Sequence, residues 1–197
     1  GPSGVGKGTL CKRLLAGPLA AALRLAVSHT TRAPRPGEEN GRDYYFMDAA
    51  AFEAAVADGA FLEWARYNGH CYGSSWAAIR QAADATPAGD PDARAEGLCL
   101  LEIEVQGAMQ VRARCPGALL VFIAPPDLDT LGERLRTRGT EDGATIGRRL
   151  AIAREELARA DAFDAVLVNA GLDACVAGLE ALLRERLHAL DCAEDMA

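Results

Sequence analysis

A glycine-rich segment at the start of the chain has the residue types and spacing of a phosphate-binding loop. Residues 1–9 read GPSGVGKGT, in which four residues separate Gly1 from a Gly6-Lys7 pair. Such loops turn backbone N–H groups toward phosphate oxygens, and only glycine tolerates the required dihedral angles. We therefore expect Lys7 to reach the β- and γ-phosphates of a nucleotide, with the positive end of the following helix facing them. The alternative is an ordinary glycine-rich turn.

The position after the lysine departs from the usual pattern. Serine or threonine normally follows the lysine directly and binds Mg²⁺ through its hydroxyl. Here Gly8 follows Lys7, and Thr9 comes next. The hydroxyl ligand is therefore displaced to Thr9 or replaced by water.

Arginines mark two further candidate sites. Arg32 and Arg35 lie on a proline-stiffened loop, where two planar guanidinium groups can hold one phosphate from two sides. A second basic segment contains Arg134, Arg136, Arg138, Arg148 and Arg149. A cationic segment that closes over nucleotides suits phosphoryl transfer, which needs in-line positioning and positive charge more than covalent help. The alternatives are solvated surface arginines in the first case and a basic helix face in the second, which Arg136 and Arg148 fit.

Composition limits the class of protein. The chain has 197 residues, half of them apolar and a quarter charged, which suits one globular domain. A net charge of −7 argues against a duplex nucleic-acid binder, and no apolar run is long enough for a membrane span. The six cysteines form no Cys-x-x-Cys pair and are expected to be free thiols. We expect a cytoplasmic protein, or an organellar one, acting on small molecules.

Strand and helix patterns alternate along the chain, which predicts an α/β fold with a parallel core sheet and helices on both faces. Buried strands are expected at residues 25–27, 98–103, 119–123 and 165–168. Helices are expected at residues 8–15, 49–57, 76–83, 106–114, 128–137, 145–160 and 172–190, with Asp127 as an N-cap. Short strands at 44–47 and 61–67 flank one helix and predict a small inserted subdomain, and residues 86–96 read as a surface loop.

The beginning of the chain lacks one expected element. A phosphate loop normally follows a buried strand, whereas here the loop comes first. We therefore expect the first core strand to be absent from the sequence, and a restored strand before Gly1 to raise the melting temperature and the ATP affinity.

The long motifs of the chain resemble those of the guanylate kinase family, which are P-loop nucleoside-monophosphate kinases. The resemblance covers nearly the whole sequence, from GPSGVGKGT through SHTTRAPRPGEENGRDYYF, GAFLEWARYNGHCYGSS, VFIAPP, LRTRGTED and RRLAIAREEL to VLVN. It implies transfer of the γ-phosphoryl group of ATP to GMP, with Mg²⁺ as cofactor. It also implies one domain over 1–197, divided into a core (1–28, 75–130 and 151–197), a GMP-binding subdomain (about 29–74) and a helical lid (about 131–150), in a three-layer sandwich.

The same resemblance assigns roles to individual residues. The residues expected to bind ATP are Gly1, Pro2, Ser3, Gly4, Val5, Gly6, Lys7, Gly8, Thr9 and Asn169. Those expected to bind GMP are Ser28, Glu63 and Ser74 at the base, Arg32, Arg35, Tyr44 and Tyr72 at the phosphate, and Glu102 and Glu104. The expected catalytic residues are Lys7, Arg134, Arg138 and Arg149. The chemistry at the base agrees, because guanine presents N1–H and its 2-amino group as adjacent donors that one carboxylate can accept.

Two departures from the family pattern bear on the metal and the adenine. Glu102 and Glu104 stand where the family usually has aspartates, and as alternate residues of a strand they would point to one face. The longer side chains are expected to alter efficiency rather than abolish function, because a magnesium site built from phosphates, waters and one or two carboxylates has some slack. Asn169-Ala170-Gly171 replaces the usual Asn-Asp-Asp.

Two other functions stay open at this point. Guanylate kinase-like domains of scaffold proteins bind peptides without catalysis, but they tend to lose the loop lysine and the lid arginines that this chain retains. A kinase for AMP or TMP would not need Glu63, Ser28 and Ser74 as a guanine-selecting set.

Overall fold

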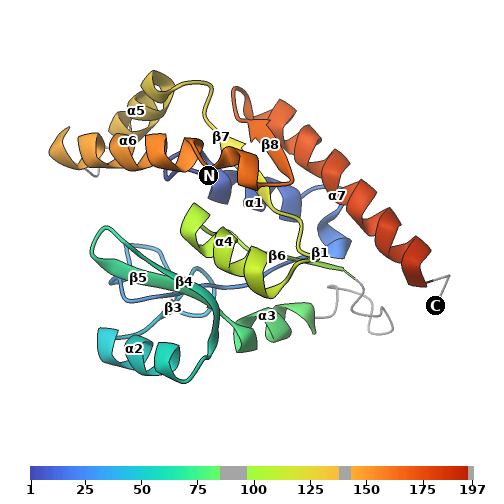
Figure 1. Ribbon diagram of the computed structural model, residues 1–197, viewed down its shortest axis with the longest axis horizontal. Helices are drawn as coiled ribbons and strands as arrows, with labels where there is room; N and C mark the ends of the chain where they lie inside the picture. The colour runs from blue at the N-terminus through green and yellow to red at the C-terminus, as the bar shows by residue number, and fades with distance from the viewer. Residues whose placement is uncertain (85–96, 138–142, 195–197) are drawn as a thin grey trace. The chain divides into compact units, whose positions relative to one another are not determined.

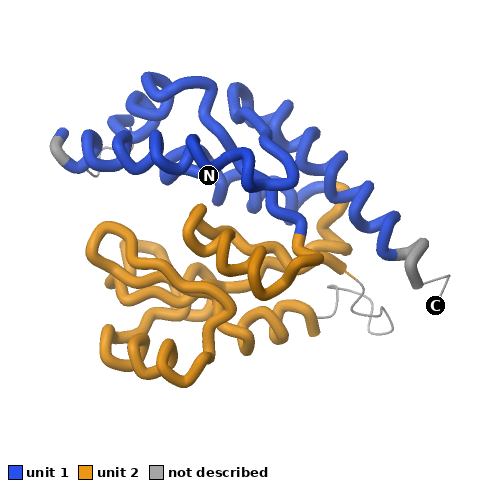
Figure 2. The backbone as a smooth tube through the Cα atoms, viewed as in Figure 1, with its two compact units in different colours: residues 1–17, 119–197 blue, residues 18–118 orange. Residues whose placement is uncertain are grey.

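The computed structural model describes residues 1–84, 97–137 and 143–194, and Figure 1 shows its helices and strands in order. These residues form two compact units, one made of residues 1–17 and 119–197 and the other of residues 18–118 (Figure 2). The loop expected at 86–96 and Arg138 lie outside the described residues. No helix among the described residues is long and apolar enough to cross a membrane.

The first unit is built on two parallel strands, β7 (Val121–Ala124) and β8 (Ala165–Val168), which pair along their whole length. Its helices are α1 (Lys7–Leu15), α5 (Leu128–Thr137), α6 (Gly143–Leu157) and α7 (Leu172–Glu194), with a short 3₁₀ turn at Ala160–Ala162. Helix α5 packs on α6, and α7 packs on both α1 and β8. The predicted N-cap is confirmed, because the carboxylate of Asp127 accepts a hydrogen bond from Thr130 N at 2.6 Å.

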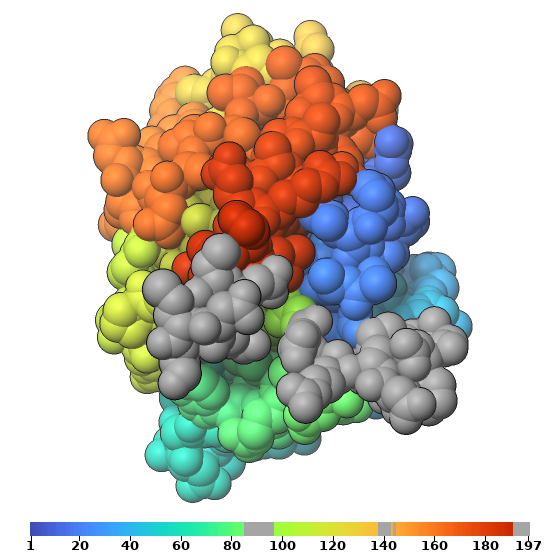
Figure 3. Space-filling model, turned by 90° about the vertical axis from the view of Figure 1, so that its right-hand side faces the viewer, coloured from blue at the N-terminus to red at the C-terminus, as the bar shows by residue number. Residues whose placement is uncertain are grey.

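Helix α7 and strand β8 show how this unit divides apolar from solvent-facing side chains. Cys175, Val176, Leu179 and Leu183 form the buried side of α7, and its outer side lies on the surface that Figure 3 shows in red. Leu167 of β8 lies against Gly178 of α7. Because strand side chains alternate, Val166 and Val168 point the other way and are 46% and 54% exposed. The prediction that β8 is a buried strand is therefore wrong for one of its faces.

The second unit contains two sheets. Strands β1 (Leu23–Leu25) and β6 (Leu98–Leu100) form a parallel pair. A four-stranded mixed sheet has the order β3-β2-β5-β4, made of β2 (His29–Thr30), β3 (Tyr45–Phe46), β4 (Phe61–Tyr67) and β5 (His70–Ser75). The helices are α2 (Ala49–Ala57), α3 (Trp76–Ala83) and α4 (Val105–Arg114), and a 3₁₀ turn at Ala20–Ala22 precedes β1.

A small apolar core holds the mixed sheet against α2. It consists of Phe52, Phe61 and Cys71, with Met47, Ala55, Val56 and Trp64 packed around them. The rings of Phe52 and Phe61 stack at a centroid distance of 4.5 Å. Asp48 caps α2 and Ser75 caps α3, each accepting a hydrogen bond from the N–H group three residues later. The mixed sheet and α2 thus share an apolar core to which β1 and β6 contribute no residue.

Two parts of this unit differ from the sequence prediction. Strands β2 and β5 were not expected, and β5 joins β4 through Asn68-Gly69, whose φ angles of +48° and +79° make the tight turn of a hairpin. The strand expected over 98–103 ends at Leu100, because its partner β1 ends at Leu25 and Ala26 N makes the last bond to Leu100 O. Glu102 and Glu104 therefore follow the strand. The expectation that they are residues i and i+2 of a strand is wrong.

The remaining expected elements agree with the structure to within a few residues. The helices α2, α3 and α5 and the strands β4 and β8 have the predicted bounds. The cysteines whose side chains are described, at 11, 71, 99, 115 and 175, are free thiols as expected.

Candidate active site

The phosphate loop of the first unit ends in a helix whose N-terminus is open. Gly6 occupies the N-cap position of α1 with a φ of +104°, and no capping side chain or acidic first-turn residue is present there. A Cβ atom at Gly6 would lie 2.9 Å from Nδ2 of Asn169, so both the conformation and the space require glycine. The first N–H groups of such a helix, together with its dipole, form an anion-binding site.

Lys7 folds back over this loop. Its ammonium group donates to the carbonyl oxygens of Gly1 and, at 3.2 Å, Pro2. The lysine thereby holds its charge inside the turn that would cradle phosphates. A phosphate oxygen can replace either carbonyl as acceptor, because an ammonium group donates to three partners in rotatable directions.

Three residues far along the chain reach this loop. Asn169 is buried, and its side-chain Nδ2 donates to Val5 O at 2.8 Å. The backbone carbonyl of Asn169 accepts from Nη2 of Arg134 at 2.9 Å. Arg149 of α6 donates from Nη1 to Ser3 Oγ at 3.1 Å. The structure therefore brings Lys7, Arg134, Arg149 and Asn169 to one loop. Asn169 supports the loop backbone directly, a contact that the sequence did not indicate.

A cavity of about 590 Å³ opens beside the loop. Its walls are the loop residues Gly4, Val5, Gly6 and Thr9, one face of α5 with Thr130, Glu133, Arg134 and Thr137, and residues 169–172. Nη1 of Arg134 is buried and has no hydrogen-bond partner among the described residues. A buried guanidinium N–H without a partner is costly, so this donor is suited to an anionic ligand. The cavity has the size of a nucleotide site next to a phosphate loop.

In the second unit, Glu63 and Ser74 form a buried pair across β4 and β5. They are opposite each other in the strand register, and Ser74 Oγ donates to Glu63 Oε1 at 2.7 Å. Glu63 is 4% exposed, and burial raises the pKa of its carboxyl although hydrogen bonds from the side chain and backbone of Ser74 oppose the shift. One carboxylate oxygen is thus held by Ser74, which orients the group for donors on a ligand.

Arg32 is held over two aromatic rings. Its guanidinium carbon lies 5.3 Å from the ring centroid of Tyr44 and 6.0 Å from that of Phe46, and the rings of Tyr44 and Tyr72 meet edge to face at a centroid distance of 6.1 Å. Nη2 donates to Glu38 Oε1 at 2.9 Å, and Nη1 donates to Ala33 O at 2.7 Å. Arg32, Tyr44 and Tyr72, three of the four residues expected at the GMP phosphate, therefore lie together.

Glu38 is a residue that the sequence analysis missed. Its second carboxylate oxygen accepts from the backbone N–H of Arg35 at 2.7 Å. The Glu38 carboxylate therefore bonds to the side chain of Arg32 and to the backbone of Arg35, the two arginines expected to bind phosphate. Burial alone would raise the pKa of Glu38, but the hydrogen bonds from Arg32 and from the Arg35 backbone lower it, and the carboxylate stays ionised. The side chain of Arg35 itself is exposed. The signal was a glutamate three residues after Arg35 in a Pro-Gly turn.

The other residues expected to bind GMP in this unit are Ser28, Glu102 and Glu104. Burial, and then the charge of Glu102, raises the pKa of Tyr44. Glu104 occupies the N-cap position of α4 without a capping side-chain bond. Ser28 is half-buried, and its carbonyl accepts from Tyr45 N at 2.9 Å. Within residues 1–84, 97–137 and 143–194, no three His, Cys, Asp or Glu side chains form a metal-binding group.

Comparisons with known proteins agree with this geometry. The family model described as guanylate kinase matches residues 1–186. The guanylate kinase of Gloeobacter violaceus is 48% identical over 187 residues, covering 95% of this chain and 85% of that protein. The guanylate kinase of Thiobacillus denitrificans is 45% identical over 189 residues, with the same two coverages.

A solved structure shows the same fold. The crystal structure of guanylate kinase from Anaplasma phagocytophilum superposes with a TM-score of 0.69 at 27% sequence identity, covering 92% of this chain and 82% of that chain. The matched region includes the phosphate loop, both arginine segments and the β4–β5 hairpin. This chain therefore belongs to the guanylate kinase family.

Proposed function

We propose that this chain transfers the γ-phosphoryl group of ATP to GMP, giving ADP and GDP. The observation that carries the proposal is the buried carboxylate of Glu63, oriented by Ser74, in a chain that also contains an open phosphate loop with Lys7. A buried carboxylate selects a ligand that offers paired donors, and guanine offers N1–H and its 2-amino group.

On the donor side, we assign the triphosphate of ATP to the loop of residues 1–9. Lys7 would exchange a carbonyl of its own loop for a phosphate oxygen, and the start of α1 would face the same group. Arg134 and Arg149 would place positive charge against the moving γ-phosphoryl group. Arg138 has the same assigned role from its sequence position alone. The adjoining cavity lined by α5 and residues 169–172 is the proposed place of the adenosine.

On the acceptor side, we assign the base to Glu63, Ser74 and Ser28 and the phosphate to four further residues. These are Arg32, Arg35, Tyr44 and Tyr72. The phosphate oxygen of GMP attacks the γ-phosphorus of ATP in line with the departing ADP oxygen, so one P–O bond forms as another breaks. The arginines and tyrosines orient that oxygen and neutralise the acceptor phosphate, while exclusion of water favours transfer over hydrolysis.

Magnesium is the proposed cofactor, bound together with ATP. The available side chains fit a hard cation, since Thr9 and Glu102 are exposed and Glu104 is half-buried, and all three carry oxygen donors. We propose that phosphates and waters supply most ligands and that these three residues are the protein's candidate ligands or water contacts. When bound, the ion neutralises charge on the phosphates.

The same reasoning supports a functional division of the chain. We propose a core of residues 1–28, 75–130 and 151–197, a GMP-binding subdomain over about 29–74 and a lid over about 131–150, within a three-layer P-loop fold. The alternative of a non-catalytic interaction domain is not favoured, because Lys7, Arg134 and Arg149 all lie at the phosphate loop.

A coupled spectrophotometric assay tests the proposed function. ATP and Mg²⁺ are held constant, and GMP, AMP and TMP are compared as acceptors, with the Lys7→Ala variant as the blank. We expect kcat/KM for GMP to exceed that for the other acceptors by at least about 100-fold. Equal use of AMP and GMP, or ADP release that does not depend on the acceptor monophosphate, would contradict the proposal.

A further inference from the structure

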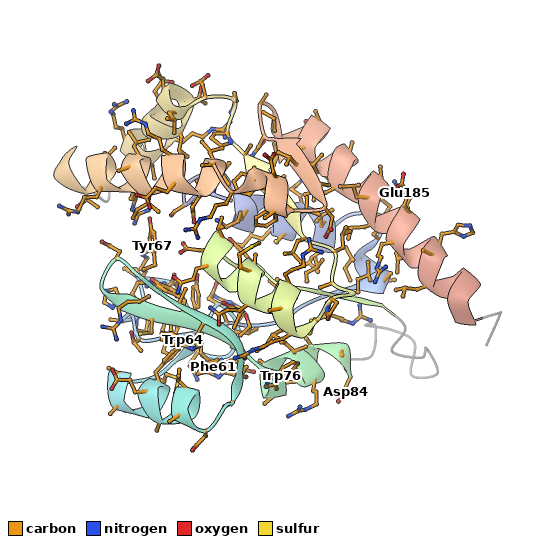
Figure 4. All side chains as sticks on the ribbon, viewed as in Figure 1. Phe61, Trp64, Tyr67, Trp76, Asp84 and Glu185 are labelled. Carbon is orange, nitrogen blue, oxygen red and sulfur yellow. The ribbon has the colours of Figure 1, made fainter. Side chains whose placement is uncertain are left out.

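The carboxylate of Glu63 owes its direction to an irregularity in β4. Phe61 and Trp64, labelled in Figure 4, both contact Phe52 of α2, at ring-centroid distances of 4.5 and 6.5 Å. Residues three apart on a regular strand face opposite sides of the sheet, so these two contacts require an extra residue between them. The register indeed shifts between Phe61 and Glu63, which is a β-bulge. With Phe61 and Trp64 turned to α2, Glu63 is turned to α4.

Helix α4 provides the space for that carboxylate at Gly107. A Cβ atom there would lie 2.2 Å from Glu63 Oε2 and 2.9 Å from its Cδ, closer than any side chain allows. Glycine in the middle of a helix is less favourable than alanine, and at position 107 the space taken by the Glu63 carboxylate accounts for it. Gly107 and Ser74 therefore bound the two oxygens of the carboxylate from two sides.

The same face of α4 holds the backbone of β4. Gln110 accepts from Trp64 N at 3.2 Å and donates to Trp64 O at 2.6 Å, so its amide replaces a neighbouring strand at the free edge of the sheet. Nη1 of Arg114 donates to Phe61 O at 2.8 Å and Leu62 O at 2.7 Å, the two carbonyls of the bulge. Gly107, Gln110 and Arg114 lie three and four residues apart and so share one helix face, here called the α4 stripe.

We propose that the α4 stripe sets the base selectivity of the acceptor site by fixing the position of the Glu63 carboxylate. The proposal rests on the proposed function, in which that carboxylate binds guanine. A carboxylate accepts two adjacent donors well only when both oxygens are held in the plane of the base to within a few tenths of an ångström. The stripe fixes the carboxylate in two ways: Gly107 leaves space for it, and Gln110 and Arg114 hold the backbone of β4 by hydrogen bonds. These three are positioning residues that need not touch the substrate.

The direct test is Gly107→Ala, measured with GMP and with inosine monophosphate, which keeps N1–H but lacks the 2-amino group. We expect KM for GMP to rise at least about 10-fold, kcat to change less than about 3-fold, and the preference for GMP over inosine monophosphate to fall. The matched control is Gly178→Ala in α7, where the new methyl would meet only the flexible end of Leu167 at 3.3 Å. The control should keep the parent kinetics.

A double-mutant cycle separates positioning from a general packing defect. In a Glu63→Ala background no carboxylate remains to be displaced, so Gly107→Ala should add less than about 2-fold to KM for GMP. Equal losses in both backgrounds would overturn the inference. Gln110→Met, which keeps side-chain length but removes both hydrogen bonds, covers the case in which Gly107→Ala does not fold. It should lower the preference for GMP in the same direction, and an unchanged preference would also overturn the inference.

The cycle also tells this inference apart from the proposed function. If Glu63→Ala alone leaves the kinetics with GMP unchanged, the assignment of Glu63 to the base is wrong. If Glu63→Ala raises KM for GMP while neither Gly107→Ala nor Gln110→Met changes the base preference, the proposed function stands and the role of the α4 stripe is wrong.

Discussion

The key side chains of the two candidate nucleotide sites have different kinds of hydrogen-bond partner. In the unit of residues 1–17 and 119–197, cationic side chains gather at a glycine-rich loop and bond to neutral groups, as Lys7 does with Pro2 O and Arg134 with Asn169 O. In the unit of residues 18–118, the key side chains bond to partners of complementary charge or polarity, as Arg32 does with Glu38 and Glu63 with Ser74.

This difference matches what each ligand demands. A triphosphate is recognised by its charge, and loop N–H groups with nearby cations bind any such group without reading a base. A particular monophosphate is selected by its base, which requires a buried polar group that is costly to leave unpaired. Under the proposed assignment, the first site would supply transition-state charge and the second would supply base discrimination, so mutations in the two should affect different kinetic constants.

The largest effect is expected at Lys7. Lys7→Ala should lower kcat by about 1,000-fold or more, because the lysine is the loop's own cation against the transferring phosphoryl group. KM for GMP should change less than about 2-fold, because the proposed role of Lys7 is with the ATP phosphates and the proposed GMP-binding residues do not include it. Steady-state kinetics with varied GMP checks this, and turnover close to that of the parent would show that the loop is not catalytic.

The next largest effect is expected for Glu63→Gln, in KM for GMP rather than in kcat. An amide offers one acceptor and one mismatched donor to guanine, so KM for GMP should rise about 100-fold, with a smaller change in KM for ATP. Titrations with each substrate measure both constants. Kinetics with GMP equal to those of the parent would remove Glu63 from base recognition.

The same substitution has a stability consequence that depends on pH. Because burial raises the pKa of Glu63 in the folded state, its contribution to stability is full below the unfolded pKa and is lost as pH rises through the folded pKa. Glu63→Gln should therefore melt at a higher temperature than the parent near neutral pH. The gap should close as pH falls toward the ordinary pKa of a carboxyl group. Melting curves across this range check the sign, and a gap that widens on acidification would contradict it.

Glu38→Gln tests whether the ion pair of Glu38 with Arg32 helps binding of the GMP phosphate or competes with it. We expect KM for GMP to rise about 5- to 10-fold, because the loss of charge weakens the bonds that hold Arg32 and the turn at Arg35. Glu39→Gln is a matched control, since among the contacts described the carboxylate of Glu39 pairs only with the exposed side chain of Arg42. A fall in KM would show instead that Glu38 competes with the substrate phosphate.

Asn169→Ala should have a moderate effect on the donor side alone. It removes the bond from Nδ2 to Val5 O, which is buried and worth about 1 kcal/mol, and leaves that carbonyl without its side-chain donor. KM for ATP should rise about 3- to 10-fold with KM for GMP unchanged. Initial rates at varied ATP measure this, and an effect on GMP alone would contradict the separation of the two sites.

The smallest effect is expected from Glu102→Asp combined with Glu104→Asp. These side chains lie after β6 rather than within it, and a magnesium site made largely of phosphates and waters tolerates a change of one methylene. Activity should stay within about 3-fold of the parent and can rise. Measuring kcat against magnesium concentration checks this, and an inactive double variant would show that the longer carboxylates are integral to the metal geometry.

The two units also differ in how much of them could be predicted from the sequence. The glycine-rich loop and α5 are local features, marked by glycine spacing and by the cap at Asp127; the bounds of α5 were predicted correctly, and α1 begins one residue earlier than predicted. Strand β5 was missed because Gly73, Ser74 and Ser75 are weak strand formers. The Asn68-Gly69 pair, a strong hairpin signal, could have revealed it.

Other features could not be found by local pattern. The bulge at Phe61 and Glu63 breaks the alternation on which strand assignment depends, and its carbonyl groups bond to Arg114 of α4, about 50 residues away along the chain. The end of β6 is set by the length of its partner β1, which is distant in sequence. Asn169 and Val5 are 164 residues apart, so their hydrogen bond follows from the fold and not from either motif.

One crossed binding experiment tests the separation of the two sites most directly. Calorimetric titration of ATP–Mg²⁺ and of GMP is carried out on the parent, Lys7→Ala and Glu63→Gln. We predict that Lys7→Ala weakens binding of ATP while GMP affinity stays within about 2-fold, and that Glu63→Gln weakens binding of GMP while ATP affinity stays within about 2-fold. If both variants lose affinity for the same nucleotide, the assignment of the loop to ATP and of the β4–β5 hairpin to GMP is wrong.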